Sequence, residues 1–129
     1  MTRSRAIAAV SVVVVTVILC WFGVTRYRVF LACKQRRAAF DARADALEKA
    51  ARTGLKVGSK RNELVWFFVK NEISLSVVGS LATGDIHTTG CAPIGCTSDE
   101  AIIGLRVEIN EAGTVTSEPV VVRRYTSCY

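Results

Sequence analysis

The sequence lacks the short motifs that mark common catalytic and nucleotide-binding sites. It has no glycine-rich phosphate loop, no H-E-x-x-H zinc-protease motif and no G-x-S-x-G nucleophile motif. Its acidic residues do not suggest a paired-carboxylate site either, because Asp99 and Glu100 are adjacent and point to different faces of an extended segment. We therefore predict that the chain is not an enzyme and has no cofactor and no catalytic residue.

A basic region interleaved with aromatic residues is missing from the C-terminal half. The formal net charge is +6, from 17 basic and 11 acidic residues. The excess base lies in residues 1–61, whereas residues 62–129 are net acidic. Nucleic-acid-binding domains usually carry a basic face, so we predict no nucleic-acid partner. At 129 residues the chain has room for one small domain.

Charged residues are absent from residues 6–24, AIAAVSVVVVTVILCWFGV. A helix of this length, at about 1.5 Å per residue, crosses a hydrocarbon core of about 30 Å. The stretch WFGVTRYR is bulky and charged where a signal peptidase needs small residues. Instead of a cleaved signal peptide we predict an uncleaved signal-anchor, a transmembrane helix that contacts the lipid bilayer over residues 6–24 and follows a basic tail, residues 1–5.

Glycine and proline are absent from Val29–Arg52, which favours a helix. Apolar residues recur there at spacings of four and three, with one interruption by Arg37. They are Cys33, Phe40, Ala44, Leu47 and Ala51. We predict a helical stalk over residues 25–53 that ends at Thr53–Gly54 and packs in part on the following domain. The same seam could instead form a homodimeric coiled coil.

Residues 54–129 begin with an amphipathic helical pattern that places Leu64, Phe67 and Phe68 on one face. The turn before this helix and the first residues of the helix form one pattern, made by Val57, Gly58, Ser59, Glu63, Leu64 and Val65. Over Leu55–Val69 they resemble small bacterial envelope domains, the outer-membrane-assembly lipoproteins and β-lactamase-inhibitor-like proteins. There a V-G-[ST]-x-x-[DE]-[VL] turn opens a helix before a small antiparallel sheet, although Glu63 lies one place later here. The resemblance implies a small α+β envelope domain without catalytic residues.

Alternating patterns follow the helix. They are partial in ISLSVVGSLA and clear in Ala101–Asn110 and Thr114–Thr126. The NEAG turn between the last two predicts a hairpin with Gly113 at positive φ, and Pro119 predicts an edge strand or a bulge. Proline and glycine indicate a loop over residues 84–100. The expected fold class is α+β: the transmembrane helix and stalk, then one amphipathic helix packed on an antiparallel sheet of three or four strands.

The loop HTTGCAPIGC allows three chemistries. It could hold a disulfide between Cys91 and Cys96, with Cys128 as the alternative partner. It could bind zinc through His87 and these three cysteines, or carry a nucleophilic cysteine assisted by His87. The C-x4-C spacing is wide for a zinc site and Cys128 has no close second cysteine, so we favour the disulfide and assign no metal ligand.

The membrane orientation is predicted from two opposing signals. Basic residues after the apolar run favour a cytoplasmic C-terminus, whereas a disulfide requires an oxidising compartment. We give more weight to the disulfide and expect a periplasmic or extracellular domain. A domain that faces the cytoplasm with free thiols is the alternative.

The chain is thus predicted to be a non-enzymatic interaction or structural module of the cell envelope, binding a protein partner through a sheet edge or the cysteine loop. The alternative is a small metal-binding or thiol-redox protein that uses His87, Cys91, Cys96 and Cys128.

Overall fold

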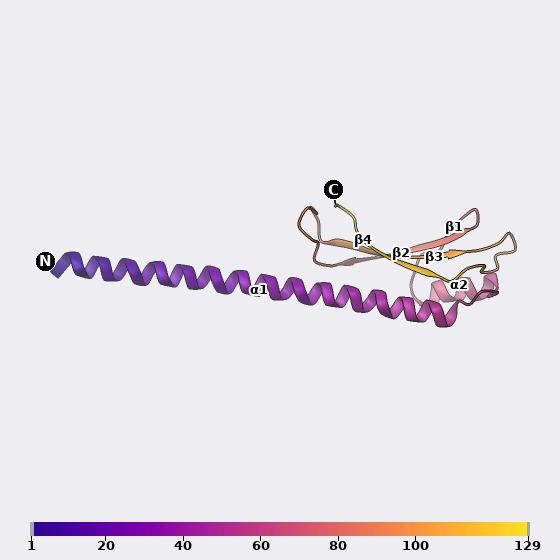
Figure 1. Ribbon diagram of the computed structural model, residues 1–129, viewed down its shortest axis with the longest axis horizontal. Helices are drawn as coiled ribbons and strands as arrows, with labels where there is room; N and C mark the ends of the chain where they lie inside the picture. The colour runs from indigo at the N-terminus through magenta and orange to yellow at the C-terminus, as the bar shows by residue number, and fades with distance from the viewer. Residues whose placement is uncertain (1, 129) are drawn as a thin grey trace. The chain divides into compact units, whose positions relative to one another are not determined.

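The computed structural model describes residues 2–128, excluding the side chains of residues 2–6 and 8. The side chains of the predicted basic tail, residues 1–5, thus lie outside the described part. The elements are α1 (Thr2–Gly54), α2 (Arg61–Lys70), β1 (Ser76–Val78), β2 (Leu81–Thr89), β3 (Glu100–Glu108) and β4 (Val120–Tyr125) (Figure 1). This α+β architecture confirms the predicted fold class. The chain divides into two units, Met1–Gln35 and Arg36–Tyr129.

The first unit contains the N-terminal part of α1. The described large apolar side chains from Ile7 to Leu31 are exposed, and α1 is long and apolar enough to cross a membrane. Two of its hydroxyl groups are satisfied within the helix: Ser11 Oγ donates to the Ile7 carbonyl at 2.9 Å, and Thr16 Oγ1 donates to the Val12 carbonyl at 2.8 Å. Such bonds let hydroxyl side chains reside in hydrocarbon, where no water replaces a missing partner.

The second unit begins inside α1. Four residues of the predicted stalk seam, Phe40, Ala44, Leu47 and Ala51, belong to the hydrophobic core of this unit. The compact domain therefore starts at Arg36 and not at residue 54, because the sheet needs this helical face to cover it. The part of the seam from Phe40 onward is buried within one chain, so it has no free apolar face for a coiled-coil partner.

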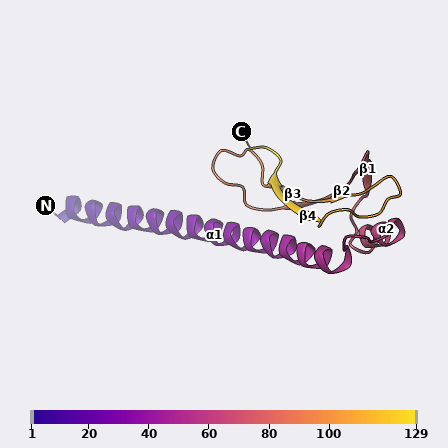
Figure 2. The same ribbon diagram turned by 45° about the vertical axis from the view of Figure 1, so that its right-hand side comes forward.

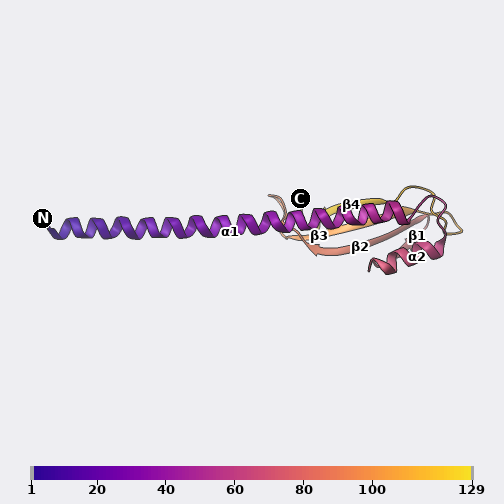
Figure 3. The same cartoon turned by 90° about the horizontal axis from the view of Figure 1, so that it is seen from below.

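The sheet is antiparallel with the order β1-β2-β3-β4. Residues of α1 from Arg36 onward and α2 lie on one side of it (Figures 2 and 3). The central strand β3 buries four alternate side chains against the helices, Ala101, Ile103, Leu105 and Val107. From α2, Leu64, Phe67 and Phe68 join this core as predicted. Within residues 36–128, the opposite face of the sheet carries no helix (Figures 2 and 3).

The loop predicted over residues 84–100 is wrong for residues 84–89, which belong to strand β2. The strand continues to Thr89, and the loop is confined to residues 90–99. Gly84 lies opposite Leu105, and a Cβ there would collide with the Ile73 side chain and would meet the Ser74 carbonyl oxygen at 2.6 Å. The glycine thus serves close packing inside a strand, a role that local sequence signals do not distinguish from a loop.

The turn before β4 follows the prediction at Gly113, whose φ is +76° and whose N–H donates to the Asn110 carbonyl at 2.8 Å. The hairpin is irregular beyond it. Ile109 pairs with Val115, and if that register continued, Arg106 would lie opposite Glu118. Instead Arg106 pairs with Val120, so the C-terminal strand contains two extra residues at this point. The extra residues form an irregular segment just before the edge strand β4, where the missing N–H of Pro119 costs no sheet hydrogen bond.

Candidate functional site

The cysteine loop, residues 90–99, connects β2 to β3 and is held by hydrogen bonds from several directions. The Gly90 N–H donates to the Asp99 carbonyl at 2.8 Å, and the Ala92 N–H donates to Asp99 Oδ1 at 3.0 Å. Gly90 lies under the Tyr125 ring, since a Cβ there would meet the ring at 2.8 Å. At the tip, Ile94 is fully exposed. The loop is therefore an ordered projection with one apolar side chain at its end.

The disulfide of this loop is Cys96–Cys128. The pairing corrects the expected Cys91–Cys96 bridge and uses the alternative partner. Tertiary structure is the reason: the segment after β4 returns along the loop, where the Thr97 N–H donates to the Ser127 carbonyl at 2.9 Å and Cys96 faces Cys128 across a β-bridge. Cys91 and Cys33 are also half-cystines, so among the described residues Cys20 holds the free thiol. Disulfides are typical of an oxidising compartment.

The structure does not assemble the zinc ligands of the alternative interpretation. Cys91, Cys96 and Cys128 are all oxidised, whereas zinc binds thiolates. Across residues 2–128, no group of three or more His, Cys, Asp or Glu side chains is arranged to hold a metal ion.

His87 lies on the uncovered face of the sheet, in a strand and not in the expected loop. Its Nδ1 is 3.1 Å from Glu100 Oε1. The hydroxyl of Thr126 donates to the other oxygen of Glu100 at 3.3 Å. The imidazole and the carboxylate are 65% and 51% exposed, so both are solvated. A nucleophilic cysteine beside His87 therefore gains no support from this geometry.

A second ion pair lies beside the first. Arg124 Nη2 donates to Asp85 Oδ2 at 3.2 Å. The pair crosses β3 above Gly104, where a Cβ would lie 3.0 Å from Asp85 Oδ1. The glycines and the proline of residues 84–100 predicted a loop and so gave no sign of this cluster. The alternation of a strand, continued through this stretch, places Asp85 and His87 on one face. All four side chains of the cluster are substantially exposed to solvent.

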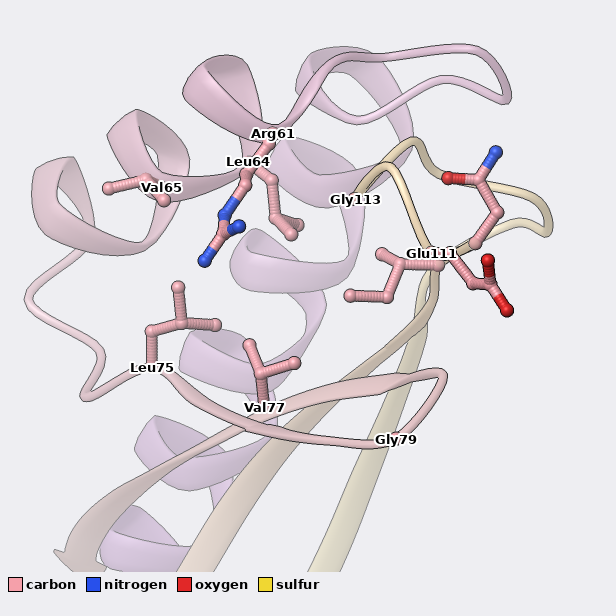
Figure 4. A pocket seen from close by; sticks show the side chains of 10 residues that line it. Arg61, Leu64, Val65, Leu75, Val77, Gly79, Glu111 and Gly113 are labelled. Carbon is pink, nitrogen blue, oxygen red and sulfur yellow. The ribbon is translucent and has the colours of Figure 1, made fainter.

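A small pocket lies between α2, β1 and the turn after β3 (Figure 4). Arg61, Leu64 and Val77 are among its lining residues, and its volume is about 140 Å³. Sites for drug-sized ligands are usually about 300–1,000 Å³. We therefore assign it no small-molecule ligand.

No family model, curated protein or solved structure matches the chain. The resemblance to envelope domains over Leu55–Val69 accordingly stays a prediction, and any function must be argued from the geometry above.

Proposed function

We propose that the chain is a single-pass membrane protein whose C-terminal domain is a non-enzymatic interaction module of the cell envelope, on the periplasmic or extracellular side. The observation that carries this proposal is the combination of an apolar helix with exposed side chains and a disulfide-containing domain on one chain. The first feature supports anchoring in a bilayer. The second supports an oxidising compartment for the domain.

An interaction role follows from what the domain displays. A continuous hydrophobic core fills its interior, and its cysteine loop projects into solvent with Ile94 exposed at the tip. The outer edge of β4 is also unpaired within the described residues, because β4 pairs with β3 alone. Exposed strand edges and ordered loops are surfaces that protein partners use.

Thiol counting tests the compartment directly. The full chain, expressed in its own membrane, is denatured in detergent with maleimide-polyethylene glycol and no reductant. Because four of the five cysteines are half-cystines, we expect one adduct, which disappears in Cys20→Ser. Prior reduction should give five adducts. A count of five without reductant would place the domain in a reducing compartment and refute the proposal.

Anchoring is tested separately by washing the membranes with alkaline carbonate. The chain should stay in the pellet with the lipid. Release into the supernatant would contradict a membrane-spanning segment.

A further inference from the structure

Three apolar side chains of α2 are exposed to solvent. Trp66 is 66% exposed and Val69 is 63% exposed, and Val65 lies beside them at 39%. The inner face of the same short helix fills the core. The outer side chains therefore contribute nothing to the core, and a large exposed aromatic next to two valines marks a surface that gains stability when a partner covers it.

Basic side chains surround this apolar strip. Lys56, Arg61 and Lys70 line the same surface as Trp66. No ion pair neutralises any of the three within the described side chains. The acidic residue that lines it is Glu63, whose Oε2 accepts the Lys60 N–H at 2.9 Å and so caps α2. The surface thus has an excess of unpaired positive charge.

Two shallow hollows flank Trp66. One, of about 520 Å³, is lined by Arg61, Val65 and Val69, and the other, of about 410 Å³, includes Lys56 and Lys70 in its lining. Both include Trp66. Hollows beside a central aromatic provide places for partner side chains, as at protein interfaces whose energy is concentrated in a tryptophan.

Within the domain, α2 lies far from Arg36, the residue at which the domain begins. Within the domain, the helical stretch of α1 from Arg36 to Gly54 spans about 27 Å at 1.5 Å per residue. The chain continues to the apolar segment at Arg36, whereas α2 lies at the Gly54 end, with Phe67 against Gly54. The exposed tryptophan therefore lies at the end of the domain remote from the point where the chain leaves it.

We propose that this surface, formed by Lys56, Arg61, Val65, Trp66, Val69 and Lys70 and called the Trp66 surface, binds an acidic segment of a protein partner that also presents apolar side chains. The inference rests on the proposed interaction function and names its partner chemistry. Trp66 and the valines lose water on binding, while the basic rim attracts the acidic segment and disfavours basic ones.

The test uses the full chain with Trp21→Phe, so that Trp66 is the single tryptophan, in nanodiscs of neutral phosphatidylcholine. The probes are two labelled 16-residue amphipathic peptides, one of leucine and glutamate and one of leucine and lysine, with empty nanodiscs as the blank. Anisotropy gives the dissociation constant, and a blue shift of emission reports burial of Trp66. Three variants are compared: Trp66→Ala, Lys56→Glu with Lys70→Glu, and the matched control Arg43→Glu with Arg106→Glu.

The acidic peptide should bind with a blue shift and at least about tenfold more tightly than the basic peptide. Trp66→Ala and the lysine pair should each weaken it by about tenfold or more, and the arginine control by less than about twofold. Equal binding of both peptides, no binding, or equal losses in the control overturns the proposal. So does Trp66-dependent binding of phosphatidylglycerol vesicles without peptide binding, which would assign the surface to lipid.

Failure of this proposal is distinguishable from failure of the proposed function. One maleimide adduct, membrane retention and no peptide binding would leave an anchored extracytoplasmic domain with a different contact surface. Five adducts would refute the compartment whatever the peptides do.

Discussion

Removing the Cys96–Cys128 disulfide should destabilise the domain more than any surface substitution. The two cysteines are 32 residues apart in sequence. A cross-link that closes a loop of this length lowers the entropy of the unfolded chain by an amount that corresponds to about 4 kcal/mol at 25 °C. Small domains are stable by only about 5–15 kcal/mol. The variant Cys96→Ser with Cys128→Ser should therefore lose a large fraction of its stability.

Urea unfolding of the full chain in neutral detergent micelles measures this effect. In the Trp21→Phe background, Trp66 emission follows the domain alone. With a urea dependence of about 1–2 kcal/mol per molar for a domain of this size, the midpoint should fall by about 2 M or more. Cys20→Ser is the control, because that thiol is free and exposed. A midpoint shift below about 0.5 M for the double variant would refute the loop-closure argument.

Three further outcomes are expected. A fragment of residues 36–129 should give a dispersed amide NMR spectrum, whereas residues 54–129 should not, because the shorter fragment lacks the α1 side chains of the core. Gly84→Ala should lower the urea midpoint by an amount equivalent to about 1–3 kcal/mol, because the added methyl group meets the Ser74 carbonyl oxygen. An unchanged midpoint would contradict the close packing at Gly84. His87→Ala should cost less than about 1 kcal/mol, because the pair with Glu100 is solvated; a larger loss would show that the cluster supports the fold.

Much of the architecture is visible in local patterns. The uncharged run over residues 6–24, the helical spacing from Phe40 to Ala51 and the alternation of β3 are repeated over enough residues to outweigh individual exceptions. Gly113 at positive φ is equally local, because the turn requires a conformation that glycine adopts without strain.

Features that depend on residues distant in sequence were harder to predict. The continuation of β2 to Thr89, with the loop beginning at residue 90, depends on Gly84 fitting against Ile73 and Ser74. The partner of Cys96 depends on where the end of β4 returns. The basic residues of the Trp66 surface come from both halves of the chain, since Lys56 and Arg61 lie in the net basic residues 1–61 and Lys70 lies in the net acidic residues 62–129.

The sequence by itself determined which segments are apolar, helical or alternating, because hydrophobic periodicity expresses the face that each element must bury. Only the tertiary structure decided that the domain begins at Arg36 within the stalk helix, that Cys96 pairs with Cys128, and that unpaired cations gather around an exposed tryptophan. The physical reason is that pairing and burial are set by distances between elements, and those distances exist only once the helices have packed on the sheet.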